Sequence, residues 1–214
     1  MTDTHKPQAM EPSGVTGRLF ACLMERMNEK AYRWVTDRLD NSAPRRLHEI
    51  GFGTGRFLEL AATRLPVTRA TGVDPSELMV ARARKRLARR HPSLQVDLRQ
   101  GTDASDFWAG EPIDACVALH SFQFWQNPDE TLRRLRDRLH QKGLLVLVLR
   151  RHGRNPPAWL PNPVSRSAEE IPETRRLLEK TGFSLVTDEA LDSASWGLAT
   201  TPRQLGCNAG TPSL

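Results

Sequence analysis

Alternating glycines that follow an acidic residue form the segment of the sequence best suited to hold a ligand. The segment reads Glu49-Ile-Gly51-Phe-Gly53-Thr-Gly55. Glycine has no side chain, so a backbone rich in it lets a ligand approach closely. A second acid, Asp74, follows nineteen positions after Gly55. A carboxylate at that point can accept hydrogen bonds from both hydroxyls of a ribose.

Two details separate this pattern from a site for a nicotinamide dinucleotide. The third glycine of the dinucleotide fingerprint is replaced by Arg56. Glu49 would repel a pyrophosphate, whereas it can engage an ammonium group or a hydrogen-bond network around an amino acid. The pattern therefore indicates a ligand with a ribose, no phosphates and a cationic amino-acid end, and S-adenosylmethionine fits that description. The alternative is a structural glycine turn in another α/β fold.

The elements around these residues alternate between strands and helices. A strand over 46–50 enters the glycine turn, a helix follows it and ends at Pro66, and a strand over 68–73 leads into Asp74. Pro75 is expected in the first turn of the next helix, which runs to about Arg90 with Asp74 or Ser76 as its cap. Further strands are expected at 94–99, 113–119, 144–149, 183–187 and 196–200, and further helices at 129–141 and 168–180. This alternation predicts an α/β protein with a parallel sheet, closed by the last two strands as an antiparallel hairpin.

Four regions are expected along the chain. Residues 1–13 are polar and predict a flexible tail, and 14–44 contain an amphipathic helical pattern, interpreted as a helical cap over the active site. Residues 45–200 form the ligand-binding domain, and 201–214 predict a second flexible tail.

Composition narrows the class of protein. The 214 residues carry a net charge of +6, and 38% are hydrophobic. The longest apolar run, Gly143 to Leu149, is far shorter than a membrane helix requires. No secretory signal is visible, and Cys22, Cys116 and Cys207 are widely spaced, so we expect a cytoplasmic protein without a disulfide framework or metal site. Cys116 lies in an apolar strand pattern and is interpreted as a core thiol.

The sequence resembles the class I S-adenosylmethionine-dependent methyltransferases of the ubiquinone and menaquinone biosynthesis type, and within them a compact bacterial subgroup with a methyltransferase domain of type 11 or 25. Glu49 to Gly55 is similar to the first motif of that family, and Gly72 to Met79 to the second. Gly101-Thr-Asp103-Ala104 is similar to a Gly-Asp-Ala segment, with one inserted residue. The resemblance implies a Rossmann-like fold with a mostly parallel seven-stranded sheet, helices on both faces and an antiparallel C-terminal hairpin.

The same resemblance implies a set of contacts with S-adenosylmethionine. In the family the acid of the second motif holds the ribose, the methionine packs on the adenine, and the later Asp contacts the adenine amine. The implied contacts are Glu49, Gly51, Gly53, Gly55, Asp74, Pro75, Met79, Asp103, Ala104, Leu119 and Tyr32. Tyr32 could reach the methionine carboxylate, or it could be a core aromatic next to Trp34.

The methyl acceptor is expected beyond the fourth strand. His120 follows that strand and is the candidate general base, with a pocket-wall role as the alternative. Family members often carry a His pair where this chain has Gln123 and Phe124. The candidate substrate contacts are Phe122, Phe124, Trp125, Arg150 and Met27. Arg150 would suit an anionic acceptor, although a solvated loop is the alternative, and Trp125 could serve in packing.

These features predict methyl transfer from S-adenosylmethionine to a small-molecule thiol, hydroxyl or amine, mainly by proximity and orientation, with S-adenosylhomocysteine as the product. One alternative is a nucleic-acid methyltransferase. The basic charge favours it, but residues 113–125 contain no Asn/Asp-Pro-Pro-Phe/Tyr segment, and the basic run Arg82 to Arg90 is interpreted as a solvated helix face. The others are a non-catalytic S-adenosylmethionine-binding protein and an enzyme that contacts an anionic membrane surface. A monomer or homodimer is expected.

Overall fold

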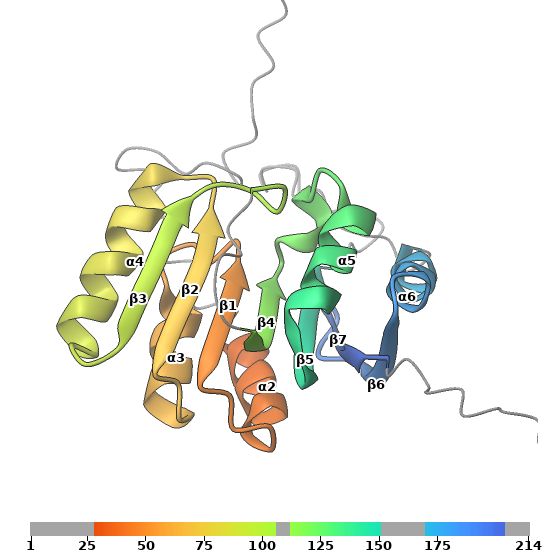
Figure 1. The fold of residues 1–214 in the computed structure, drawn as a ribbon, viewed down its shortest axis with the longest axis horizontal. Coiled ribbons are helices and arrows are strands. Elements are labelled where there is room, and N and C mark those ends of the chain that lie inside the picture. The colour runs from red at the N-terminus through yellow and green to blue at the C-terminus, as the bar shows by residue number, and fades with distance from the viewer. Residues whose placement is uncertain (1–27, 106–111, 151–169, 204–214) are drawn as a thin grey trace, which may run out of the picture.

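A single seven-stranded sheet organises the protein (Figure 1). The computed structural model describes residues 28–105, 112–150 and 170–203. The strand order is β3-β2-β1-β4-β5-β7-β6, and only β7 runs antiparallel to its neighbours. The strands are β1 (Arg46–Ile50), β2 (Arg69–Asp74), β3 (Gln95–Gln100), β4 (Ile113–Leu119), β5 (Leu139–Arg150), β6 (Phe183–Ala190) and β7 (Ser195–Pro202). The expected Rossmann-like sheet with an antiparallel C-terminal pair is confirmed.

Helices cover both faces of this sheet, as expected (Figure 1). They are α2 (Glu29–Asp40), α3 (Arg56–Arg64), α4 (Glu77–Arg90), α5 (Pro128–Arg138) and α6 (Glu170–Lys180), with a short 3-10 turn, η1 (Phe122–Phe124). Successive residues of a strand point to opposite faces of the sheet, so β4 contributes side chains to the hydrophobic cores on both faces. Val117 packs with the residues of α2, α3 and α4, whereas Cys116 packs with those of α5 and α6. The thiol of Cys116 is fully buried, and burial raises its pKa, consistent with a core role.

Short-range signals explain where α4 begins. The Ser76 hydroxyl accepts a hydrogen bond from the backbone N–H of Met79, which is the usual N-cap arrangement. Ser76 is therefore the cap, one of the two expected. Pro75 lies before the cap and not in the first turn, which corrects the sequence-based expectation.

The boundary between α5 and β5 differs from the expectation of a helix up to residue 141. The helix ends at Arg138, and Leu139 already pairs with Ile113 of β4. Leu144 pairs with Ala115, so β5 accommodates extra residues, of which 140–142 are exposed. Gly143 makes this irregularity possible, because a Cβ atom there would lie 3.0 Å from the carbonyl oxygen of Asp114. Leu139 continues the helical spacing of Leu132 and Leu135 although it belongs to β5, so the sequence pattern did not reveal the end of the helix.

Two tryptophans hold the β6–β7 pair from opposite faces of the sheet. Trp34 on α2 donates a hydrogen bond to Glu189 at 2.7 Å, and the Arg38 guanidinium lies over the Trp34 ring. On the other face, Trp196 donates to Asp188 at 2.7 Å beside Arg175. Helix α2 therefore packs on the sheet next to α3. Residues 14–27 of the expected cap lie outside the described residues, and the division into domains and tails stays a prediction.

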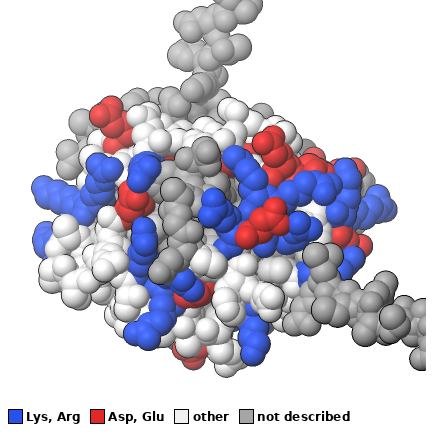
Figure 2. Space-filling view, in the orientation of Figure 1, with Lys and Arg blue, Asp and Glu red and all other residues white. Residues whose placement is uncertain are grey.

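The basic residues do not form one continuous stripe on the face that carries α5; acidic residues lie among them (Figure 2). Asp129 pairs with both Arg133 and Lys180 there. On α4, the side chains of Arg86 and Arg90 reach Glu59 of α3, and that of Arg84 donates to the carbonyl oxygen of Leu98. Part of the arginine run from 82 to 90 therefore holds α4 to its neighbours.

Candidate functional site

The glycine turn between β1 and α3 has a backbone conformation that other residues rarely adopt. Gly51, Gly53 and Gly55 have φ values of 80°, 53° and 75°. A Cβ atom on Gly51 would lie 2.5 Å from Cβ of Ser121, and one on Gly55 would lie 2.8 Å from Cβ of Ala83. Among the described atoms, nothing lies within 4 Å of a Cβ built on Gly53. The turn is therefore packed at both ends and open in its middle.

Asp74 faces this opening from the end of β2. Its Oδ2 accepts a hydrogen bond from the backbone N–H of Gly53 at 2.7 Å, and its Oδ1 accepts one from Ser76 at 3.0 Å. Burial raises the pKa of Asp74 to about 6, although the two backbone donors act in the opposite direction. A buried carboxylate at this place can accept hydrogen bonds from a hydroxylated ligand.

Glu49 lies next to Asp74, at the centre of the sheet. It pairs with Gly72 on one side and Val117 on the other, and its side chain is buried. Its Oε2 has no hydrogen-bond partner among the described residues. Burial, together with the charge of Asp74, raises the pKa of Glu49 well above its usual range. A buried carboxyl oxygen without a donor is unfavourable, so this position suits a ligand that supplies one.

His120 directly follows β4. Its φ of 54° is in the left-handed region, and its backbone N–H donates to the carbonyl oxygen of Val148 at 2.8 Å. Its Nδ1 is buried and has no partner among the described residues. Burial and the charge of Arg150 lower the pKa of His120 to about 3. The imidazole is therefore neutral near pH 7 and is a weak base.

Arg150, the last residue of β5, joins this group. Its Nη2 donates to Oδ1 of Asn28 at 3.2 Å, which connects β5 to the start of α2. Burial lowers its pKa, whereas the charges of Asp192 and Tyr32 raise it. A guanidinium nevertheless keeps its charge in a protein. The structure thus gathers Tyr32, His120 and Arg150, which the sequence-based analysis named for different roles.

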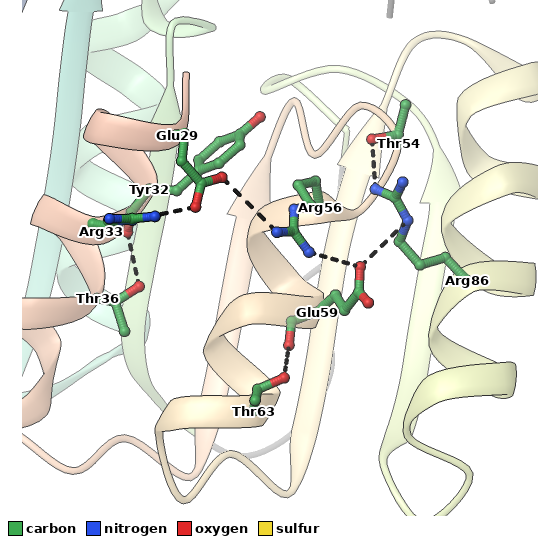
Figure 3. A network of polar contacts seen from close by, with 9 residues as sticks. All are labelled: Glu29, Tyr32, Arg33, Thr36, Thr54, Arg56, Glu59, Thr63 and Arg86. Atoms are coloured by element: carbon green, nitrogen blue, oxygen red, sulfur yellow. Dashed lines mark hydrogen bonds and ion pairs between the residues drawn. The ribbon is translucent and has the colours of Figure 1, made fainter. Parts of the chain in front are cut away.

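A polar network behind the glycine turn was missed by sequence reasoning (Figure 3). Arg56 lies 3.8 Å from Glu29 of α2 and 3.3 Å from Glu59 of α3. Glu59 also lies 3.5 Å from Arg86 of α4, which donates to the Thr54 hydroxyl of the turn at 2.9 Å. The network therefore ties the turn to three helices. The spacing of Arg56 and Glu59 within one helical turn was the available signal.

Asp103, the residue expected to contact the adenine, has hydrogen-bond partners around the start of α5. Its carboxylate accepts hydrogen bonds from the backbone of Gln126 at 3.1 Å and from the Thr131 hydroxyl at 3.0 Å. Asp103 therefore also helps to position that helix, and its contact with adenine stays a prediction. The neighbouring Ala104 is exposed.

The expected acceptor residues do not lie together. The rings of Phe122 and Trp125 pack at a tilt of 60° with centroids 4.8 Å apart inside the core beneath α5 and α6, because η1 turns both rings inward. Phe124 is half-buried, and Arg150 lies with His120. Met27 lies outside the described residues. Of the remaining cofactor candidates, Leu119 ends β4 and is buried, and Met79 is buried in the first turn of α4.

Residues 48–145 match the model of a family described as a methyltransferase domain. This segment begins in β1 and ends in β5, so it contains the glycine turn, Asp74 and His120. The chain contains a methyltransferase domain. The resemblance inferred from the motifs is thereby confirmed at the level of the family.

Curated relatives of this methyltransferase domain include two enzymes with named acceptors. Trans-aconitate 2-methyltransferase from Streptomyces coelicolor is 28% identical over 148 residues, which is 69% of this chain and 46% of that protein. Malonyl-[acyl-carrier protein] O-methyltransferase from Paenibacillus sp. is 31% identical over 108 residues, 47% of this chain and 37% of that protein. The chain thus spans less than half the length of these relatives.

Solved structures show the same fold at low sequence identity. The structure of the Haloferax volcanii Trm112 methyltransferase activator with a putative methyltransferase matches with a TM-score of 0.71 at 12% identity, covering 86% of this chain and 94% of that one. Magnesium protoporphyrin IX methyltransferase from Synechocystis with bound S-adenosylmethionine matches with a TM-score of 0.61 at 16% identity, covering 90% and 85%. None of the described helices is long and apolar enough to cross a bilayer.

Proposed function

We propose that the methyltransferase domain transfers a methyl group from S-adenosylmethionine to a small-molecule acceptor and releases S-adenosylhomocysteine. The observation that carries this proposal is the opening at Gly53, flanked by two buried carboxyl groups. Asp74 already accepts a hydrogen bond from Gly53, and Glu49 has an oxygen without a partner among the described residues. Two buried acids at the turn suit a cationic nucleoside better than a dinucleotide.

The proposed ligand lies across the carboxyl ends of β1, β2 and β4, where ligands bind in open α/β sheets. Asp74 accepts hydrogen bonds from the ribose hydroxyls, and the carboxyl of Glu49 faces the amino-acid part of the cofactor. Gly51, Gly53 and Gly55 allow the backbone to approach it. Pro75 and Met79 flank the adenine, and Leu119 and Tyr32 lie toward the methionine end.

Methyl transfer from a sulfonium requires little covalent assistance, because the donor carries its own leaving group. Holding the acceptor atom in line with the methyl–sulfur bond supplies most of the acceleration, and well-oriented reactants gain about 7–11 kcal/mol in favourable cases. His120 is neutral, and its buried Nδ1 lies beside the proposed acceptor position, where it positions the acceptor. A cytoplasmic location, a monomeric or dimeric state and the absence of a nucleic-acid partner stay predictions.

Calorimetric titration with S-adenosylmethionine and S-adenosylhomocysteine tests the cofactor. The wild type should bind both with micromolar affinity, and Asp74→Ala should lose most of that affinity. Asp137→Ala is the matched control. Asp137 is an exposed acid on α5, and the residues of β2 lie far from it in the sequence. Equal binding by Asp74→Ala would show that the ribose has been misplaced. Absence of binding to the wild type would remove the cofactor assignment itself.

A further inference from the structure

Arg150 is a half-buried cation without a close acidic partner among the described residues. Its one hydrogen bond within that part of the chain goes to the neutral amide oxygen of Asn28, although a guanidinium has five N–H donors. Asp192 contributes charge at longer range, and its Oδ1 accepts a hydrogen bond from the backbone of Ala194. Keeping a cation out of water is costly unless an anion compensates it. Arg150 therefore has donors available for an anionic ligand.

The position of Arg150 places such a ligand next to the proposed cofactor site. The backbone of His120 is hydrogen bonded to Val148, two residues before Arg150 on β5. The next residue, Ser121, packs against Gly51 and donates a hydrogen bond to the carbonyl oxygen of Ile50. The ends of β1, β4 and β5 thus adjoin one another. An anion on Arg150 lies at the same edge of the sheet as the glycine turn.

We propose that Arg150 binds the carboxylate of the methyl acceptor and makes the protein a carboxylate O-methyltransferase, an inference that rests on the proposed function. One carboxylate oxygen attacks the methyl carbon of S-adenosylmethionine. A carbon–oxygen bond forms as the carbon–sulfur bond breaks, and its electron pair stays on sulfur. The products are a methyl ester and the neutral thioether S-adenosylhomocysteine. No proton is transferred, because the acceptor enters ionised.

The surroundings of Arg150 favour this class of acceptor over a phenol or an alcohol. A planar guanidinium matches the two oxygens of a carboxylate, with parallel hydrogen bonds. A phenol or alcohol would need a base to remove its proton. Among the described residues, the histidine beside Arg150 is His120, and its pKa is lowered to about 3. Its unpartnered Nδ1 can instead hydrogen bond to the acceptor. Among the described residues, the charges of Asp192 and Tyr32 also act on Arg150.

The acceptor class is tested with S-adenosylmethionine labelled in the methyl group and a panel of carboxylic acids that includes trans-aconitate and malonate, alongside phenols, thiols and amines. A methyl ester releases volatile labelled methanol in alkali, whereas ethers, thioethers and amines keep the label. At saturating S-adenosylmethionine we expect alkali-labile product from carboxylates, with kcat/KM for the carboxylate constant from pH 7 to 9. Activity that rises toward pH 9, or alkali-stable product, would overturn the carboxylate proposal and leave the cofactor assignment intact.

The role of Arg150 is tested with Arg150→Gln and Arg150→Lys. Loss of one partner of a buried charge pair weakens binding by roughly 30-fold or more, so Arg150→Gln should lower kcat/KM by that factor, chiefly through KM. Arg150→Lys should recover part of the loss. Affinity for S-adenosylmethionine should stay near the wild-type value in both, which also verifies folding. Arg89→Gln, which removes the same charge from the exposed end of α4, is the control.

Direct binding provides an independent measurement. Trans-aconitate and malonate are titrated into the protein saturated with S-adenosylhomocysteine, and into Arg150→Gln in the same state. Binding that is lost in the variant supports the proposal. Equal binding by both proteins, or neither binding nor methylation of any carboxylate by a protein that binds the cofactor, overturns it. Failure of the wild type to bind S-adenosylmethionine would instead remove the proposed function.

Discussion

The backbone N–H of Gly53 donates a hydrogen bond of 2.7 Å to Oδ2 of Asp74, which joins the glycine turn to the end of β2. The open position in the turn and the acid that faces it are therefore held at a fixed separation. A ligand that binds between them must either replace this hydrogen bond or donate further hydrogen bonds to Asp74. Its affinity then depends on whether Asp74 is ionised.

The first prediction concerns the pH dependence of cofactor binding. Asp74 has a pKa of about 6, and ribose hydroxyls donate to its ionised form. Below pH 6 binding must first remove a proton, so affinity falls as pH falls, by about tenfold between pH 7 and pH 5. The raised pKa of Glu49 acts in the same direction. Calorimetric titration at both pH values measures the affinity, and the affinity of Asp74→Asn should depend less on pH. Equal affinities for the wild type would contradict it.

Two glycines of the turn should respond differently to alanine. A methyl group at Gly53 has free space but would enter the ligand opening, so Gly53→Ala should mainly abolish cofactor binding. The left-handed backbone adds about 1–2 kcal/mol of instability. Gly55→Ala carries the same strain and also a contact of 2.8 Å with Ala83. It should lose about 2–4 kcal/mol in urea unfolding. Equal stabilities of the two variants would contradict the close packing of Gly55 against Ala83.

Glu59 should contribute more to stability than an exposed acid does. Its side chain is only 14% exposed, and its carboxylate lies within 4 Å of Arg56, Arg86 and Arg90. Glu59→Gln leaves three neighbouring guanidinium groups without their shared anion, and we expect a loss of about 1–2 kcal/mol in unfolding free energy. Asp137→Asn, at a site that is 62% exposed, should lose less than about 0.5 kcal/mol. The difference between the two variants should narrow in high salt.

The contact between α2 and β7 gives a fourth prediction. A Cβ atom on Gly197 would lie 2.4 Å from Cη2 of Trp34, so Gly197→Ala should destabilise the protein by about 1–3 kcal/mol. Thermal unfolding measures this loss. In a Trp34→Leu background the ring is absent, and the same alanine should then be nearly neutral. A loss of the same size in both backgrounds would place the cause elsewhere.

The sequence predicted elements with a local signal more accurately than contacts between distant residues. The glycine turn, the strand before it and Ser76 as a cap depend on neighbours in the chain, and they were placed correctly. The α5–β5 boundary depended on how Gly143 packs against Asp114, which no local pattern reveals.

The candidate site shows the same division. Glu49, Asp74 and the glycines were identifiable from spacing alone. The use of Asp103 at the start of α5 and the burial of Phe122 and Trp125 depend on how η1 folds back onto the sheet. The proximity of Asn28 to Arg150 joins positions far apart in the chain, which single-sequence reasoning cannot detect.

The place of β7 in the sheet has a consequence for how the protein is made. β7 comes last among the described strands, yet it is inserted between β5 and β6. Synthesis proceeds from the N-terminus, so β5 can pair with β4 early. Residues 195–202 must leave the ribosome before β5 acquires its second neighbour and before β6 acquires its neighbour in the sheet. Until then the apolar edge of β5 is exposed and able to pair with other chains. A nascent chain arrested before Ser195 should therefore recruit chaperones, whereas one that has released Pro202 should escape them.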